Sequence, residues 1–206
     1  MTSSTTSPET SSLPMALTIA RFAAAPIVAG LIFLASQLLY TEGRDWTVTV
    51  LSFALVVFIL AALTDWLDGA LARKLDAVSP LGAALDHAAD KALTTATLVA
   101  LGATFLPLDL TIAAALLVTR DIAVGGLREG LSLSGRALPV ASLGKLKTVV
   151  TMVAIGAAIA FQIARLAIAE GAIVSVVEVL SRFTLWSAVI LALWSGVEYF
   201  VAAFRK

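Results

Sequence analysis

Two pairs of aspartates stand close together in the stretch TDWLDGALARKLDAVSPLGAALDHAADK. Asp65 and Asp68 are three residues apart, and Asp86 and Asp90 are four residues apart, so on helices each pair shares one face. Carboxylate oxygens without histidine or cysteine suit Mg²⁺ or Mn²⁺ better than zinc. Four carboxylates are about what a two-metal site uses. The spacing therefore predicts two divalent cations held between two neighbouring helices.

A simpler interpretation places these acids in water at helix ends, paired with Arg73, Lys74 and Lys91. It accounts well for a single acid, but it accounts poorly for two helix-phased pairs on adjacent apolar segments. A carboxylate near the middle of a bilayer costs about 2.5–3.5 kcal/mol, and clustering several adds repulsion. Divalent cations would compensate this charge better than two or three basic side chains alone.

Small residues accompany the acids: Gly69 and Ala72 follow the first pair, and Gly82 lies one turn before the second. Small side chains allow a bulky polar ligand to approach the backbone and the metals. They also allow close helix packing, and spacing alone leaves both readings open.

The composition shows which class of protein must position these acids. Hydrophobic residues make up 60% and charged residues 14% of the 206 residues, and the mean hydropathy is +0.99. Soluble domains are usually about half apolar and about a quarter charged, so we expect an integral membrane protein. The net charge of zero gives no basic signature for nucleic acid. With no cysteine and one histidine, disulfides, thiolate catalysis and zinc–thiolate sites are excluded.

The pattern predicts one all-α domain, residues 13–206, after a disordered Ser/Thr-rich tail, residues 1–12, which lacks the features of a secretory signal. Because a spanning helix needs ~20 apolar residues, we expect six transmembrane helices. They cover about 17–40, 47–72, 81–105, 108–131, 143–168 and 184–204. Residues 13–21 are expected as a short interfacial helix that leads into the first span. Residues 173–183 are expected either as the outer end of the sixth helix or as an interfacial turn.

Basic residues indicate the orientation in the membrane. One side collects Arg73, Lys74, Arg128, Arg136, Lys145, Lys147, Arg205 and Lys206. The other side collects Arg44, Arg165 and Arg182. This asymmetry predicts that both termini and the acid pairs face the cytoplasm.

The acids and their small neighbours carry a family resemblance. The positions are Asp65, Asp68, Gly69, Ala72, Arg73, Gly82, Asp86 and Asp90. They reproduce the signature D-x2-D-G-x2-A-R-x8-G-x3-D-x3-D of the CDP-alcohol phosphotransferase family, which the chain resembles at every fixed position. The six-helix membrane fold of that family agrees with the expected number of spans.

The resemblance implies that an alcohol attacks a CDP-linked donor and that CMP leaves. It implies that the four aspartates hold two Mg²⁺ or Mn²⁺ ions, with Asp90 also the general base on the acceptor hydroxyl. The donor would be held by the residues Thr18, Gly69, Ala72, Arg73, Ser79 and Gly82. Phosphoryl-type transfer depends mainly on positioning and charge neutralisation, which such a site supplies. We favour direct attack over a covalent intermediate. Members of the family are often dimers, so a homodimer is one expected assembly.

Basic residues in the fourth and fifth segments predict a phosphorylated acceptor. Arg120 and Arg128 lie two helical turns apart on similar faces, and Lys147 lies near the start of the fifth segment. Arginine binds phosphate through two parallel hydrogen bonds. Positive-inside topology and lipid headgroups also explain basic residues such as Lys145 and Arg136. They explain Arg120 poorly, because it lies deeper in the span.

The segments TRD at 119–121, RE at 128–129, GKLKT at 144–148 and TDWLDG at 64–69 resemble the bacterial phosphatidylglycerophosphate synthase subfamily. This resemblance implies transfer from CDP-diacylglycerol to sn-glycerol 3-phosphate, with Arg120, Arg128 and Lys147 binding the acceptor phosphate. It also implies a place in phosphatidylglycerol and cardiolipin synthesis at the bacterial cytoplasmic membrane. The sequence departs from the pattern at Met15, where asparagine is usual, and at His87, where proline is usual.

Other functions compete with this expectation. The acceptor could instead be inositol phosphate, serine or phosphatidylglycerol, although serine would leave the cationic residues unexplained. A divalent-cation transporter also carries intramembrane acids, but it would spread them along a path across the bilayer. A non-catalytic assembly protein would have no need for the intact motif.

Overall fold

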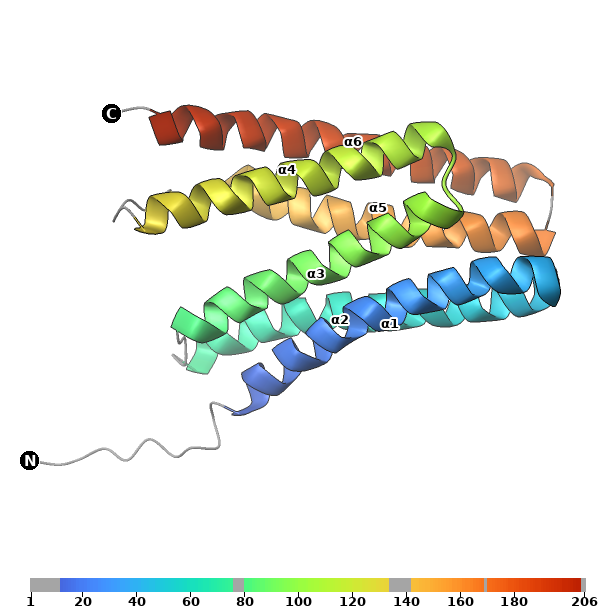
Figure 1. The fold of residues 1–206 in the computed structure, drawn as a ribbon, viewed down its shortest axis with the longest axis horizontal. Helices are drawn as coiled ribbons and strands as arrows, with labels where there is room; N and C mark the ends of the chain where they lie inside the picture. Colours follow the sequence, from blue (N-terminus) through green and yellow to red (C-terminus); the bar gives the residue numbers. More distant parts are fainter. Residues whose placement is uncertain (1–11, 76–79, 134–141, 169, 205–206) are drawn as a thin grey trace, which may run out of the picture.

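The structure, a computed structural model, describes residues 12–75, 80–133, 142–168 and 170–204, and at 12–14, 65–75, 80–83 and 142–145 it describes the backbone alone. The described residues form six helices that run side by side along one axis (Figure 1). They are α1 Ser12–Thr41, α2 Arg44–Leu75, α3 Pro80–Thr104, α4 Leu108–Leu133, α5 Ser142–Ile168 and α6 Ala172–Phe204. The all-α prediction is confirmed for these residues.

Three tight connections lie together at one end of the bundle (Figure 1). Gly43 ends the α1–α2 connection with φ +88°, and Gly171 precedes α6 with φ +144°. Both values lie where a side chain is disfavoured and glycine is not. Pro107 lies between α3 and α4, and its carbonyl accepts a hydrogen bond from the Thr111 amide at 2.9 Å. The start of α3 and the ends of α2 and α4 therefore share the opposite end of the molecule.

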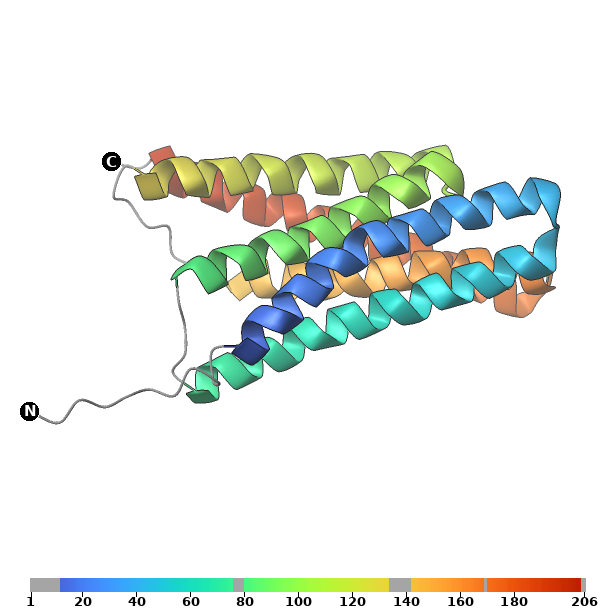
Figure 2. The same ribbon diagram turned by 60° about the horizontal axis from the view of Figure 1, so that its bottom comes forward.

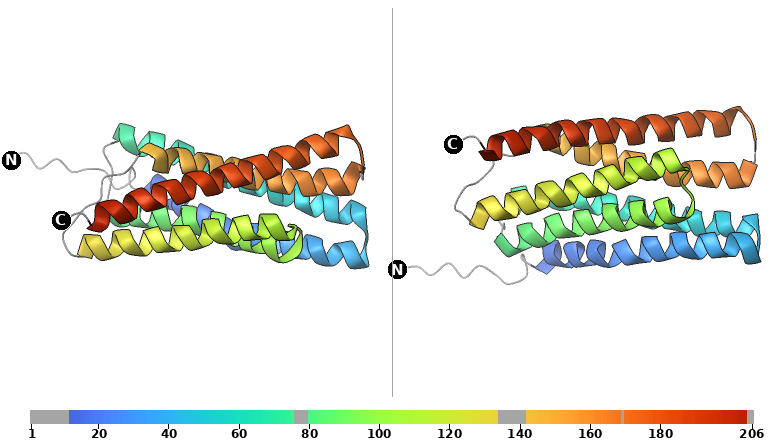
Figure 3. Two further views of the ribbon diagram at one scale, coloured as in Figure 1. Left: turned by 90° about the horizontal axis from the view of Figure 1, so that it is seen from above. Right: turned by 45° about the horizontal axis from the view of Figure 1, so that its top comes forward.

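Packing between the helices places α3 at the centre of the site end. It contacts α1, α4 and α5, while α6 contacts α4 and α5, and α2 contacts α1 and α5 (Figures 2 and 3). Small and branched residues line these contacts, among them the fully buried Val28, Ala54, Leu101, Ala158 and Ala188. Small side chains allow helix backbones to approach closely where no water drives their association.

The outer surface of the bundle is apolar as well. Phe53 and Leu60 on α2 are each 58% exposed, and Ile190 and Trp194 on α6 are 64% and 66% exposed. Large apolar side chains on both the inside and the outside are typical of helices that face lipid. By length and composition, five helices of the described chain are apolar enough to cross a membrane: α1, α2, α4, α5 and α6.

The described chain thus has the six helices that we expected. Five of them are long and apolar enough to span a membrane, so the expectation of six spans is confirmed only in part. The third helix, α3, carries Asp86, His87, Asp90 and Lys91 in its first half and is not among the five. The expected separate interfacial helix at residues 13–21 is wrong, because these residues form the first turns of α1 itself. Residues 173–183 belong to one long α6. Of the expected disordered tail, Ser12 begins α1, and residues 1–11 lie outside the described part of the chain.

Candidate active site

The two predicted acid pairs lie on α2 and α3 at the same end of the bundle (Figure 1). The side chains of several predicted site residues lie outside what the structure describes, and for them the predicted roles stay predictions. These residues are Asp65, Asp68, Gly69, Ala72, Arg73 and Gly82, all on helical backbone. Ser79 lies outside the described residues altogether.

Asp86 is paired with an arginine from another helix. Nη1 of Arg21, on α1, donates to Oδ1 of Asp86, on α3, at 2.7 Å. The Arg21 side chain is fully buried, whereas that of Asp86 is 45% exposed. Thr18, predicted to bind the donor, is also buried, one turn before Arg21. This end of α1 therefore contributes to the site, a role that the sequence indicated only for Thr18.

Asp90 has one carboxylate oxygen that no described residue contacts through a hydrogen bond. The residue is 8% exposed, and its Oδ1 is buried without a hydrogen-bond partner among the described residues. The other oxygen, Oδ2, lies 3.4 Å from Nζ of Lys91. Burying a carboxylate oxygen without a partner is costly, so such an atom favours a ligand that satisfies it. A metal ion and an acceptor hydroxyl both meet this requirement.

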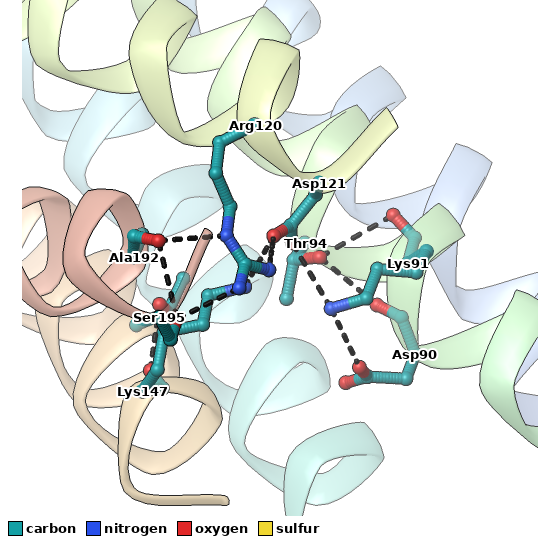
Figure 4. Close-up of polar contacts among 9 residues, drawn as sticks. Asp90, Lys91, Thr94, Arg120, Asp121, Lys147, Ala192 and Ser195 are labelled. Atoms are coloured by element: carbon teal, nitrogen blue, oxygen red, sulfur yellow. Dashed lines mark hydrogen bonds and ion pairs between the residues drawn. The ribbon is translucent and has the colours of Figure 1, made fainter. Parts of the chain in front are cut away.

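Next to Asp90, three basic side chains converge on one carboxylate (Figure 4). We call Lys91, Arg120, Asp121 and Lys147 the Asp121 cluster. Oδ1 of Asp121 accepts from Nζ of Lys147 at 2.5 Å and from Nη1 of Arg120 at 3.1 Å. Oδ2 of Asp121 accepts from Nζ of Lys91 at 3.0 Å. The cluster joins α3, α4 and α5, and the Lys147 side chain is only 3% exposed.

Helix α6 holds Arg120 from the other side. Nε of Arg120 donates to the Ala192 carbonyl at 2.8 Å, and Nη2 donates to Oγ of Ser195 at 2.7 Å (Figure 4). The guanidinium carbon also lies 6.0 Å from the centre of the Tyr199 ring. Three of the five N–H donors of Arg120 thus have partners in the described structure. The guanidinium plane is fixed by contacts on two helices.

The structure brings together two of the three residues predicted to bind the acceptor phosphate. Arg120 and Lys147 share the Oδ1 atom of Asp121. Arg128 lies two turns further along α4, and no ion pair joins it to the cluster among the described side chains. His87, one of the two departures from the subfamily pattern, is exposed on α3, and Arg128 lies within electrostatic range of it.

Sequence reasoning assigned no role to Asp121, Arg21 or Ser195. A signal for Asp121 was present, because an acid within an apolar span is costly and usually has a partner inside the bundle. It stood beside Arg120 in the TRD segment, but spacing could not show which cations would reach it. Ser195 carries no comparable signal, since serine is common where transmembrane helices meet.

The described geometry therefore places the buried carboxylate of Asp90, with one unpartnered oxygen, beside cations suited to an anion. Comparison with known proteins agrees with this combination. Residues 11–194 match the CDP-alcohol phosphatidyltransferase family. A CDP-diacylglycerol–glycerol-3-phosphate 3-phosphatidyltransferase of Bacillus subtilis is 33% identical over 91% of this chain and 93% of its own length.

Other relatives give a similar result. The protein of the same name from Wigglesworthia glossinidia brevipalpis is 36% identical over 74% of this chain and 79% of its own length. A cardiolipin synthase (CMP-forming) of rice is 33% identical over 93% of this chain but 57% of its own length. With its five apolar helices of spanning length, the chain is an integral membrane protein and belongs to the CDP-alcohol phosphatidyltransferase family.

Proposed function

We propose that the protein transfers the phosphatidyl group of CDP-diacylglycerol to sn-glycerol 3-phosphate, releasing CMP and phosphatidylglycerophosphate. The observation that carries this proposal is the convergence of Lys91, Arg120 and Lys147 directly beside Asp90. An acceptor with a phosphate and a hydroxyl fits this arrangement, because the phosphate needs cations and the hydroxyl needs a base. The names of the bacterial relatives specify the same pair of substrates. Its product would feed phosphatidylglycerol and cardiolipin synthesis.

The donor end of the site is proposed to hold two Mg²⁺ or Mn²⁺ ions on Asp65, Asp68, Asp86 and Asp90. The all-oxygen donor set fits these metals, and the buried, unpartnered Oδ1 of Asp90 fits a ligand atom. When bound, such ions neutralise and polarise the diphosphate of the donor. The small residues Gly69, Ala72 and Gly82, with Thr18, Arg73 and Ser79, would bind the CDP moiety around them.

The chain's own residues would carry the proton. The Asp90 carboxylate accepts the proton of the acceptor hydroxyl as the hydroxyl oxygen attacks the phosphatidyl phosphorus directly. The bond from that phosphorus to the bridging oxygen breaks, and CMP leaves with the electron pair. Lys91, whose Nζ lies 3.4 Å from Oδ2, orients the carboxylate. General-base catalysis of this kind contributes roughly 10²- to 10⁴-fold.

The acceptor phosphate would bind Arg120 and Lys147, with Arg128 contributing from the same helix. Arg120 is prepositioned by α6, so its ordering costs little when the ligand binds. Burial strengthens these contacts, because phosphate is bound more strongly where water is excluded.

The active-site end is proposed to face the cytoplasm, at the bacterial cytoplasmic membrane, with both termini on that side. The excess of Lys and Arg at this end supports the orientation.

Helix α3 is proposed as the sixth span. Its 25 residues extend about 37 Å, its polar residues lie in its first half, and it is packed between apolar helices. A homodimer remains part of the proposal.

A second candidate acceptor is phosphatidylglycerol, which the similarity to a plant cardiolipin synthase (CMP-forming) favours. Inositol phosphate is a third, since it also brings a phosphate to the cations. The transporter alternative is disfavoured because Asp86 and Asp90 both lie in the first half of α3 and Asp121 is already paired with three cations.

The test is CMP release by the purified protein in detergent with CDP-diacylglycerol and Mg²⁺. Glycerol 3-phosphate, inositol phosphate, serine and phosphatidylglycerol are each added separately. Release with glycerol 3-phosphate alone supports the proposal. Release with another alcohol keeps the family chemistry and replaces the acceptor. Folded protein that releases no CMP with any of them would contradict the proposed activity.

Metal dependence is tested in the same assay. EDTA is expected to stop CMP release, and excess Mg²⁺ or Mn²⁺ is expected to restore it, because the carboxylates would otherwise repel the diphosphate. Thermal unfolding measured in parallel shows whether EDTA merely unfolds the protein. Full activity in EDTA would contradict the two-metal proposal.

A further inference from the structure

Asp121 has no role in the reaction proposed above, although it lies at the centre of the cationic site (Figure 4). We propose that its carboxylate is the internal counter-anion of the acceptor site. The acceptor phosphate displaces this carboxylate from Lys147 and Arg120 when it binds. Until then the carboxylate weakens binding of small inorganic anions. This inference rests on the proposed use of a phosphorylated acceptor.

The first support is the way in which the cations approach. Lys147 and Arg120 donate to one oxygen of Asp121, and Lys91 donates to the other. Three basic side chains from three helices thus point at one oxyanion, with distances of 2.5–3.1 Å. A phosphate presents terminal oxygens that accept the same donors. The carboxylate therefore holds the donors in the orientation that the ligand requires.

The second support is the balance of charge. The Asp121 cluster contains three cations and one carboxylate, and only Lys91 has a second described carboxylate partner, Asp90. The side chains of Arg120 and Lys147 are 10% and 3% exposed, so water screens them poorly. Without Asp121 these cations would bind any small oxyanion strongly. With it, an anion must displace a carboxylate, so additional contacts such as that of the acceptor hydroxyl with Asp90 decide which anion binds.

The third support is that two of the three cations have anchors other than Asp121. Arg120 is bonded to Ala192 and Ser195 of α6, and Lys91 is paired with Asp90. Replacing Asp121 by asparagine therefore removes the competing charge while two of the three cations keep protein partners. A purely structural ion pair predicts the opposite result, because loosened cations would bind phosphate less well.

The experiment compares wild type, Asp121→Asn and Asp121→Glu as full-length proteins in detergent, without CDP-diacylglycerol. Thermal unfolding is measured against the concentration of inorganic phosphate, which is the probe. Asp109→Asn is the matched control, since it removes one carboxylate from the same helix, where Asp109 pairs with Arg182 at the opposite end. Phosphate is expected to raise the Tm of Asp121→Asn at concentrations about tenfold lower than for wild type. Asp121→Glu and Asp109→Asn should respond like wild type.

The inhibition constant of phosphate against glycerol 3-phosphate, measured by CMP release, should fall by a similar factor in Asp121→Asn. Unchanged or weaker phosphate binding by this variant would overturn the proposal. If the variant does not fold, the comparison is made between Lys147→Met and Lys147→Met/Asp121→Asn. In the double variant the two opposite charges are removed together. It should still bind phosphate more tightly than Lys147→Met. Equal or weaker binding by the double variant would overturn the proposal.

The two proposals fail separately. The phosphate-dependent Tm involves neither the donor nor the acceptor alcohol, so it reports on the counter-anion even if CMP release identifies another acceptor. Conversely, CMP release with glycerol 3-phosphate and no tightening of phosphate binding in Asp121→Asn keeps the function and removes the role of Asp121.

Discussion

At the scale of single residues, several charges in the described part of the site are paired with a partner on another helix. Arg21 of α1 contacts Asp86 of α3, and Lys147 of α5 contacts Asp121 of α4. Asp90 is the exception among these acids, because one of its oxygens is buried and unpartnered within the described structure. Asp90, whose Oδ1 atom lacks a partner, is the residue that we propose as the general base.

Asp90→Asn tests this proposal most directly. The variant is expected to lower CMP release at least about 10³-fold, since it loses both the proposed base and a metal ligand. Its Tm in detergent should change little, because the amide has nearly the shape of the carboxylate. Glu129→Gln, an exposed change on α4, is the control and should be fully active. Near-normal turnover by Asp90→Asn would remove the base assignment.

Arg21→Met is expected to lower the Tm, because Asp86 loses a cation at 2.7 Å. The cost of breaking a buried ion pair is about 3–5 kcal/mol, but Asp86 is 45% exposed, so we expect about 1–2 kcal/mol. CMP release should fall as well, since Asp86 is a proposed metal ligand. Arg44→Met, an exposed arginine at the other end, serves as control. Equal stability and activity of the two variants would show that the Arg21–Asp86 contact is dispensable.

At the scale of helices, the sequence predicted which segments are helical but not which helices contact one another. Hydropathy is a local property, so the bounds of the first five helices were predictable within a few residues, whereas the sixth begins at Ala172 and not near residue 184. Long α6 was left open because Glu178 and Arg182 interrupt its apolar pattern, and the structure pairs them with each other and Arg182 with Asp109. The hold of α6 on Arg120 was not predictable, because it depends on packing between segments far apart in the sequence.

Ser195→Ala tests the contribution of α6 to the acceptor site. Hydrogen bonds to charged groups contribute about 1.5–3 kcal/mol, so loosening Arg120 should raise the KM for glycerol 3-phosphate roughly tenfold. The KM for CDP-diacylglycerol should stay the same, because Ser195 contacts Arg120 and not the acid pairs. Ser175→Ala, on an exposed part of the same helix, should change neither value. An equal rise in both KM values would indicate a general loss of packing instead.

At the scale of the whole molecule, charge is divided between the two ends of the bundle. The proposed cytoplasmic end holds the acid pairs and the Asp121 cluster, and the opposite end holds Asp109, Glu178 and Arg182. Composition predicted a membrane protein, and the motif predicted which end of the bundle holds the active site. Composition could not predict how the charges inside that end neutralise one another, because this depends on distances of a few ångströms between helices.

The orientation can be measured because the chain has no cysteine, so a single introduced thiol is a clean reporter. Tyr40→Cys and Leu133→Cys replace side chains that are each 85% exposed, at opposite ends of the bundle. With intact bacterial cells whose outer membrane has been permeabilised, a membrane-impermeant maleimide should label the thiol at 40 and not the one at 133. The reverse pattern would place the active site on the outer face.

The length of α6 has a mechanical consequence. Its 33 residues extend about 50 Å, against a hydrocarbon core of about 30 Å, so the helix must tilt, protrude or both. Ser195 and Ala192 lie on this helix and grip Arg120. In a thicker bilayer α6 would tilt less, and in a thinner bilayer it would tilt more. Either change would shift Ala192 and Ser195 relative to Arg120. Membrane thickness would then influence the position of the α6 residues that hold Arg120 in the proposed acceptor site.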